Sequence, residues 1–216
     1  MKKPSVKFLI DVGARGSPLS RVQVEEVFRS LPGYDYVLHC VETAGDLDQK
    51  TPLRNLDKSD FFTREIDECL LNREFRIAIH SAKDLPDPLS EGLEIVALTK
   101  GVDSSDSLVL HGRVEDLPLG AKIGTSSSKR EKNIEQLRSD LQTVDIRGTI
   151  EQRLALLMKR EIAGVVIAEA ALIRLGLTHL NRVKLPGETA PLQGRLAVVA
   201  RTGDSEMREL FAPLNL

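Results

Sequence analysis

The chain has 216 residues, of which 41% are hydrophobic and 29% charged, and its formal net charge is -2. This length allows one large domain or two domains of about a hundred residues each, with the composition of a folded protein. The near-neutral charge predicts no strong attraction to nucleic acid or acidic membranes. No apolar segment approaches the roughly twenty residues that span a bilayer, so we expect a soluble protein without a membrane partner. Two cysteines that form no disulfide framework fit a reducing cytoplasm.

The first half of the chain alternates strand and helix patterns. Strands are predicted at residues 6–12, 34–41, 77–79 and 93–98, and helices at residues 19–31 and from residue 61. Residues 45–60 are polar and without periodicity, which predicts a long loop that is either a lid or merely mobile. Ser17 and Pro18 supply an N-cap and a first-turn proline for the first helix, directly after Arg15. This turn either holds an anion or simply caps the helix.

The second half continues the alternation. Strands are predicted at residues 107–111, 122–124, 143–146, 164–168 and 196–200, and helices up to residue 137 and over residues 153–158, 170–175 and 205–214. A polar segment at residues 99–103 interrupts the strand pattern and indicates that the chain crosses there from one domain to the next. We therefore predict a first domain of residues 1–100 and 190–216 and a second of residues 101–189. The fold is predicted as α/β with mainly parallel strands, in two lobes with a ligand cleft between them.

Three strand-to-helix junctions carry cations beside hydroxyl groups. They are Arg15 with Ser17, the run Thr125, Ser126, Ser127, Ser128, Lys129 and Arg130, and Arg147 with Thr149. The run of hydroxyls before Lys129 and Arg130 is the strongest anion-binding pattern, although a charged, solvated helix face would also explain its cations. Three such junctions indicate a ligand with several carboxylates or phosphates. No nucleotide-binding glycine motif occurs.

The buried strand at residues 77–79 leads into Lys83, Asp84 and Pro86. Such a strand delivers its loop to the edge of the sheet where ligands bind in open α/β folds. Lys83 and Asp84 are therefore either part of a site or an exposed surface pair. The two cysteines, Cys40 and Cys69, form neither a disulfide framework nor a metal-binding pattern, and both are predicted to pack as small apolar residues.

Seven segments carry a resemblance that spans almost the whole chain. They are ARGSPLSRVQ (14–23), FFTREIDECLL (61–71), IAIHSAKDLP (77–86), IGTSSSKR (123–130), DIRGTIEQRL (145–154), ALIRLGL (171–177) and APLQGRLAV (190–198). In this order they resemble the porphobilinogen deaminase family, also called hydroxymethylbilane synthase. The resemblance implies two lobes like those of type II periplasmic binding proteins. The family's third, α+β domain is expected to be absent, because the chain stops at Leu216.

The resemblance also implies an activity. The family condenses four porphobilinogen molecules, with loss of ammonia, into a linear polypyrrole for tetrapyrrole (haem) biosynthesis, and Asp84 would be the catalytic carboxylate. The residues that would bind substrate and cofactor carboxylates are Arg15, Ser17, Arg64, Lys83, Thr125, Ser126, Ser127, Lys129, Arg130, Arg147, Thr149, Arg153 and Gln193. The alternative is a non-catalytic two-lobe binding protein for porphobilinogen or another polycarboxylate.

The chain departs from the family pattern mainly at the attachment of the family's dipyrromethane cofactor. It is attached through a thioether to a cysteine of the third domain, and this chain is expected to lack that cysteine, since Cys40 and Cys69 stand at positions that the family uses for structure. Lys129 replaces an arginine, Thr149 an asparagine, and residues 58–60 a Gly-Lys-Gly. No metal site is expected, and a monomer is the expected state.

Overall fold

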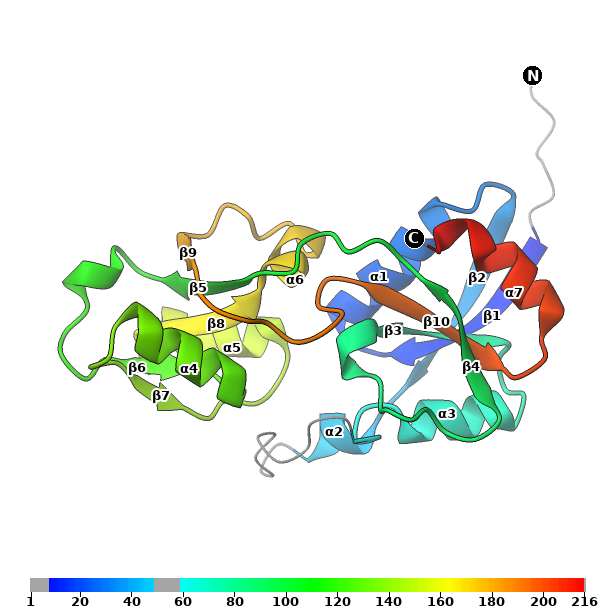
Figure 1. The fold of residues 1–216 in the computed structure, drawn as a ribbon, viewed down its shortest axis with the longest axis horizontal. Coiled ribbons are helices and arrows are strands. Elements are labelled where there is room, and N and C mark those ends of the chain that lie inside the picture. Colours follow the sequence, from blue (N-terminus) through cyan, green and yellow to red (C-terminus); the bar gives the residue numbers. More distant parts are fainter. Residues whose placement is uncertain (1–7, 49–58, 216) are drawn as a thin grey trace, which may run out of the picture. The chain divides into compact units, whose positions relative to one another are not determined.

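The computed structural model of the protein describes residues 8–48 and 59–215, and these form two compact units (Figure 1). The first unit contains the described residues 8–47, 59–100 and 195–215, and the second contains residues 48 and 101–194. The chain passes out of the first unit after Lys100 and re-enters it at Arg195. Each unit has a sheet and a hydrophobic core of its own.

The sheet of the first unit has five strands in the order β2-β1-β3-β10-β4. Their bounds are β1 Phe8–Arg15, β2 Tyr34–Val41, β3 Ile77–Ser81, β4 Leu93–Leu98 and β10 Leu196–Arg201. Strand β1 pairs in parallel with β2 and β3, whereas β10 is antiparallel to both of its neighbours, β3 and β4. The reversed strand is thus the one formed when the chain re-enters the unit.

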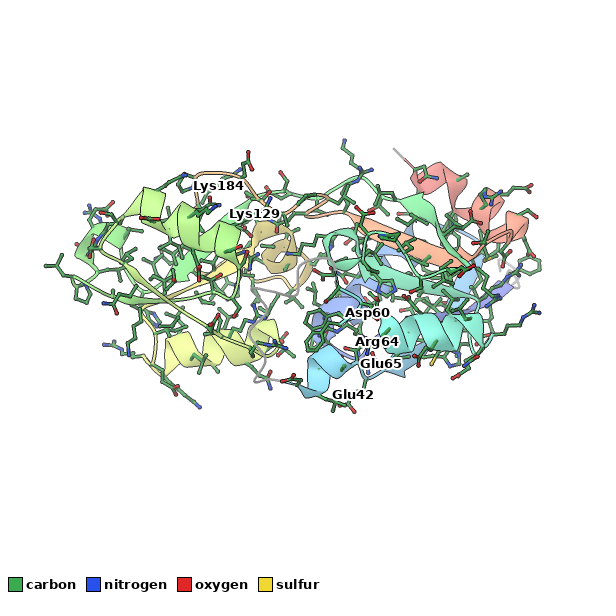
Figure 2. The ribbon with its side chains drawn as sticks, turned by 60° about the horizontal axis from the view of Figure 1, so that its bottom comes forward. Glu42, Asp60, Arg64, Glu65, Lys129 and Lys184 are labelled. Carbon is green, nitrogen blue, oxygen red and sulfur yellow. The ribbon has the colours of Figure 1, made fainter. Side chains whose placement is uncertain are left out.

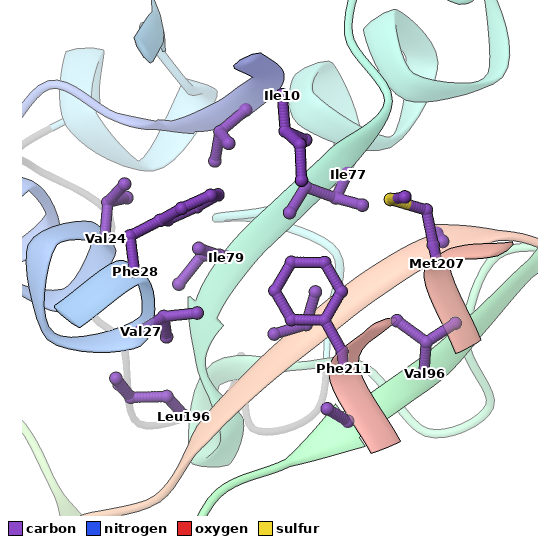
Figure 3. Close-up of a cluster of buried hydrophobic side chains, with 14 of the residues drawn as sticks. Ile10, Val24, Val27, Phe28, Ile77, Ile79, Val96, Leu196, Met207 and Phe211 are labelled. Carbon is purple, nitrogen blue, oxygen red and sulfur yellow. The ribbon is translucent and has the colours of Figure 1, made fainter. Parts of the chain in front are cut away.

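Helices cover both faces of this sheet (Figure 1). Helices α1 (Pro18–Arg29) and α7 (Ser205–Phe211) contribute Phe28 and Phe211 to the larger cluster, in which Figure 3 also shows Ile77 and Ile79. The intervening Ala78 faces the opposite side and packs with residues of α3 (Arg64–Leu71). This alternation follows from the two-residue period of a strand, and it explains why β3 is apolar on both faces.

The second unit has the strand order β7-β6-β8-β5-β9. Its strands are β5 Asp106–Leu110, β6 Lys122–Gly124, β7 Gln142–Val144, β8 Gly164–Ala168 and β9 Arg182–Lys184, and its helices are α4 Ser128–Leu137, α5 Ile150–Met158 and α6 Glu169–Arg174. Strand β6 is parallel to β7 and β8, and β5 is antiparallel to β8 and β9. The reversed strand here is β5, the first strand after the chain enters the second unit.

Several predicted elements need correction. Strand β9 was not predicted, because its three residues contain two cations and one apolar side chain. Residues 45–47, at the start of the predicted loop, belong to the short helix α2 (Ala44–Leu47), and residues 49–58 lie outside the described part of the chain. The last helix ends at Phe211 and continues as the 3₁₀ turn η4 (Ala212–Leu214). The predicted mainly parallel arrangement is confirmed among the described strands, since only one strand in each sheet runs against the other four.

Candidate functional site

The junction after β1 positions Arg15 against an acid and an aromatic ring. Its Nε lies 3.1 and 3.2 Å from the two carboxylate oxygens of Asp46, and the guanidinium lies 4.6 Å from the centre of the Phe62 ring. Burial alone would raise the pKa of Asp46, but the hydrogen bonds and charge of Arg15, together with Thr43, bring that pKa below its ordinary value. Asp46 therefore stays ionised and occupies one edge of the Arg15 guanidinium.

Ser17 caps helix α1. Its Oγ accepts a hydrogen bond from the backbone N–H of Ser20 at 3.2 Å and lies 2.9 Å from the Ser20 hydroxyl. This is the capping role that the sequence left open beside an anion-binding one. The cap fixes the backbone of the turn that follows Arg15, so Ser17 helps to position Arg15.

The turn after β3 presents Lys83 and Asp84. They lie in the short 3₁₀ helix η2 (Ala82–Asp84), where Lys83 is half-buried and Asp84 is exposed. The backbone N–H of Ala82 donates to the Arg195 carbonyl at 3.0 Å, which ties this turn to the start of β10. Asp84 is therefore a solvent-accessible carboxylate on a backbone that is held in place.

His80 lies under the same edge of the sheet. Arg15 and His80 are each two residues beyond the paired Gly13 and Ala78 on adjacent parallel strands, so their side chains face the same side. His80 is 6% exposed, and its Nε2 has no hydrogen-bond partner within the described residues. Burial, followed by the nearby charge of Arg15, lowers the pKa of His80 to about 4. The imidazole is neutral at physiological pH.

In the second unit, the hydroxyl run after β6 is largely buried. Ser126 Oγ donates to the Ile146 carbonyl at 2.6 Å and accepts from the Ile146 N–H at 3.0 Å, and Thr125 Oγ1 accepts from the Ser127 N–H at 3.3 Å. Strands β6 and β7 are parallel neighbours, so their carboxyl ends lie at one edge. Ser126 joins the two junctions at that edge, and Lys129 is exposed beside them.

Arg130 points into the unit instead. Its Nη2 donates to Asp106 Oδ1 at 2.6 Å, and the two side chains are only 13% and 3% exposed. The same oxygen accepts from Gln193 Nε2 at 3.0 Å, and that amide also donates to the carbonyls of Ser104 and Ser105. Gln193 therefore links the segment by which the chain leaves the second unit to the segment by which it enters, through hydrogen bonds to Ser104, Ser105 and Asp106.

The junction after β7 brings Arg147, Thr149 and Arg153 to the same edge. Arg147 Nη2 donates to the Asp48 carbonyl at 2.6 Å, and Arg153 Nε donates to the Gly148 carbonyl at 2.9 Å. Thr149 is the N-cap of α5 in a capping box with Gln152. Arginine has five N–H donors, so one guanidinium can bind more than one acceptor.

Each unit thus collects predicted site residues at a single edge of its sheet. Comparison with known proteins shows the family of the chain. The family model described as "Porphobilinogen deaminase, dipyromethane cofactor binding domain" matches residues 10–209. The chain belongs to the porphobilinogen deaminase family. This family supplies transferases of porphyrin biosynthesis.

Relatives and solved structures agree with this assignment. A porphobilinogen deaminase of Rubrobacter xylanophilus is 38% identical, with 94% of this chain and 69% of the relative covered. A probable porphobilinogen deaminase of Chlamydia pneumoniae is also 38% identical, with 94% and 89% covered. A periplasmic substrate-binding protein of an ABC transporter from Coxiella burnetii has a TM-score of 0.59 at 14% identity, over 95% of this chain and 91% of that one. The last match shows the two-unit fold alone.

Arg64 is exposed at the start of α3. Figure 2 shows it beside Asp60, whose carboxylate oxygens accept from its Nε and Nη2 at 2.7 and 2.8 Å. The structure therefore places the predicted ligand-binding cation in a surface ion pair. Such pairs exchange readily with solvent and ligands, so the prediction for Arg64 stays a prediction.

The two cysteines differ in their surroundings. Cys40 is exposed at the end of β2, contrary to the prediction that it packs as an apolar residue. Cys69 packs against the α3 side of the sheet, and burial together with the Glu74 carboxylate raises the pKa of its thiol. A thiol with a raised pKa is a poor nucleophile.

Two negative findings apply to the described residues only. Within residues 8–48 and 59–215, no cluster of three or more histidine, cysteine, aspartate or glutamate side chains could hold a metal ion. In the same ranges no helix has the length and apolarity required to cross a membrane.

Sequence reasoning missed four residues that contact predicted site residues: Asp46, Phe62 and His80 in the first unit, and Asp106 in the second. Asp46 lies at the start of a polar segment that was predicted as loop, and Phe62 in a predicted helix start. The adjacent aromatic residues beside a charged loop were the available signal for Phe62. The ion pairs of Asp46 and Asp106 join residues 31 and 24 positions apart, for which the sequence carries no local signal.

Proposed function

We propose that this chain catalyses the porphobilinogen deaminase reaction, in which porphobilinogen molecules condense head to tail with loss of ammonia. Four condensations would give the linear hydroxymethylbilane. The observation that carries the proposal is the exposed Asp84, held at the carboxyl end of β3 within a chain that belongs to this family. An exposed carboxylate at a sheet edge is available to a substrate from solvent.

The chemistry requires an acid and an anion at the same place. Expulsion of ammonia from the aminomethyl group is assisted by proton transfer, and the cationic azafulvene left behind is stabilised by a nearby negative charge. Asp84 would serve in both roles. Lys83, on the same turn, would bind a carboxylate of the substrate.

The residues of both units suit the carboxylates of the substrate and of a dipyrromethane cofactor. Arg15, Lys83, Lys129, Arg147 and Arg153 would hold these groups through charge-assisted hydrogen bonds. When bound, the cofactor supplies the terminal pyrrole to which the first substrate is added. Its covalent attachment does not fit Cys69, whose thiol is kept protonated by burial and by Glu74.

The test compares Asp84→Asn with Asp87→Asn, a matched loss of charge three residues further along the same exposed loop. Ammonia release and porphobilinogen consumption are measured, with substrate affinity from calorimetry. We expect Asp84→Asn to lose at least about 100-fold in turnover, as for removal of an acid-base group, while its melting temperature is unchanged. Asp87→Asn should retain turnover.

Two results would contradict the proposal. Equal turnover in both variants would remove Asp84 from the chemistry. Binding of porphobilinogen by the wild-type chain, with no ammonia released, would favour the non-catalytic binding protein.

A further inference from the structure

The two outer strands of the first sheet, β2 and β4, differ in how their edges are covered. At β4, the Asn215 side chain accepts from the Leu98 N–H at 2.8 Å and donates to the Val96 carbonyl at 3.2 Å. The residue that follows η4 therefore occupies backbone groups of that edge. Within residues 8–48 and 59–215, β2 pairs with β1 alone, so β2 is the sheet edge that no other strand covers.

Strand β2 lacks most of the features that protect an edge strand. Prolines, lysines, bulges and short length keep natural edges from pairing with another chain. The eight residues of β2, YDYVLHCV, contain no proline or lysine, and all of them pair with β1 in continuous register. None of the eight is buried, and Val37 is 44% exposed on the same face as Leu9 of β1, which is 67% exposed. The strand is therefore suited to pair with a second extended strand.

The side chains on this face are arranged symmetrically about Val37. Asp35, Val37 and His39 alternate along β2, and Asp11 of β1 lies on the same side. His39 Nε2 lies 2.7 Å from Asp11 Oδ1, and this pair is exposed. An antiparallel copy of β2 centred on Val37 places Asp35 opposite His39 of the second copy, and His39 opposite its Asp35. Opposite-charge and hydrogen-bonding pairs stabilise neighbouring strands, so β2 is complementary to itself in this register.

The backbone of β2 agrees with the same register. The Tyr36 N–H donates to the Asp35 carboxylate at 3.0 Å, which indicates that the even-numbered backbone groups point away from β1. Centring on Val37 sets Tyr36 opposite Leu38 of the second copy, as a pair that exchanges backbone hydrogen bonds. The Leu38 carbonyl then replaces Asp35 as the acceptor for Tyr36, and Asp35 is released toward His39. Asp35 and His39 fall in the alternate positions, where opposite side chains lie closer together.

Other two-fold registers lose this match. Centring the pair on Leu38 places Asp35 opposite Val41 of the second copy, and Val37 opposite His39. A centre one residue before Val37 also sets Asp35 against Val37 of the copy. Each of these arrangements opposes a carboxylate with an apolar side chain.

We propose that β2 is a self-association surface, through which two copies of this chain pair antiparallel about Val37 and join their first sheets into one. Such an interface is isologous, because each copy contributes the same residues. Pairing of two edge strands gives an interface at the small end of the range, so we expect a dissociation constant of about 10–100 µM. The monomer expected from the sequence is then the state of the dilute chain. The inference goes beyond the proposed function and does not depend on it.

Disulfide cross-linking tests the pairing and its register. Directly opposite residues in the non-hydrogen-bonded positions have Cα atoms about 4.5 Å apart, a separation that a disulfide spans. In a Cys40→Ser background with a glutathione redox buffer, Val37→Cys should form a covalent dimer. The matched control Ile95→Cys, on β4 and similarly exposed at 40%, should stay monomeric. Asp35→Cys and His39→Cys should cross-link with each other when mixed, and neither with itself.

Sedimentation equilibrium measures the association without a cross-link. Over about 1–200 µM, the wild type should pass from monomer to dimer. Val37→Lys should weaken the dimer at least about tenfold, because two like charges then lie opposite each other at the two-fold axis. The control Ile95→Lys should match the wild type. Thermal melts establish that both lysine variants fold, and the cross-linking series decides the question if either does not.

Three results would overturn the inference. They are a wild type that stays monomeric up to about 200 µM, whatever else binds β2, equal cross-linking by Val37→Cys and Ile95→Cys, and cross-linking of Asp35→Cys with itself. Turnover of porphobilinogen is measured in parallel and should be the same in Val37→Lys as in the wild type. A chain that dimerises through β2 but releases no ammonia would contradict the proposed function alone.

Discussion

Replacing His80 by glutamine should flatten the dependence of stability on pH. His80 is buried next to Arg15, and its pKa is about 4 in the folded chain, against an ordinary value of 6.5. Between these two values the unfolded chain binds a proton that the folded chain does not. Stability is therefore full above pH 6.5 and is lost as the pH falls toward 4.

The magnitude follows from the two pKa values. Each pKa unit corresponds to about 1.4 kcal/mol, so the shift of His80 costs about 3 kcal/mol when complete. Between pH 7 and pH 5 most of that is already lost, which gives about 2 kcal/mol from this one residue. Carboxylates such as Asp46 and Asp204, whose pKa values are lowered, act mainly at more acidic pH.

The assay is urea unfolding at pH 7 and pH 5 for the wild type, His80→Gln and the control His179→Gln, whose imidazole is exposed. The wild type and the control should lose about 2 kcal/mol more than His80→Gln over this interval. An absolute loss of stability in His80→Gln at pH 7 does not affect the comparison. Equal pH dependence in all three proteins would refute the reasoning.

Two further predictions concern the framework of the units. Gly194→Ala should lower the free energy of unfolding by more than about 2 kcal/mol, because its φ is +85° and the new Cβ would lie 2.2 Å from the Asp103 carbonyl oxygen. The control Gly176→Ala, with φ +68° and no atom within 4 Å of the new Cβ, should cost about 1 kcal/mol. Similar melting temperatures for the two variants would contradict this prediction. Phe211→Ala should lower the free energy of unfolding by about 3–5 kcal/mol, since Phe211 is 0% exposed. In the same denaturant titration, the control Leu119→Ala should cost under about 0.5 kcal/mol, because Leu119 is 87% exposed. A small loss for Phe211→Ala would argue against the packing of the larger cluster.

Most of the fold follows from local patterns. The bounds predicted for β2, β4, β6 and β8 match the structure, because each of these strands ends directly before a polar residue. Strand β9 could not be predicted, because its three residues form a strand through pairing with β5 and show no strand pattern of their own. The direction of β10 and β5 depends on where the chain re-enters each unit, which no local pattern encodes.

The site was predictable as a set of residues but not as a set of partners. Residue type and junction position indicated an anion site around Arg15 and Lys129. That Ser126 uses its hydroxyl on Ile146, and Arg130 its guanidinium on Asp106, depends on contacts 20 and 24 positions away in sequence. Such partners cannot be found from the local sequence pattern around Ser126 and Arg130.

The central claim is that the chain turns over porphobilinogen with Asp84 as the reacting carboxylate. The most direct measurement is the release of ammonia from porphobilinogen by the purified chain, followed over time and compared with Asp84→Asn. The account predicts steady release by the wild type and a loss of at least about 100-fold in the variant. Porphobilinogen bound without ammonia release, or equal release by both proteins, would contradict it.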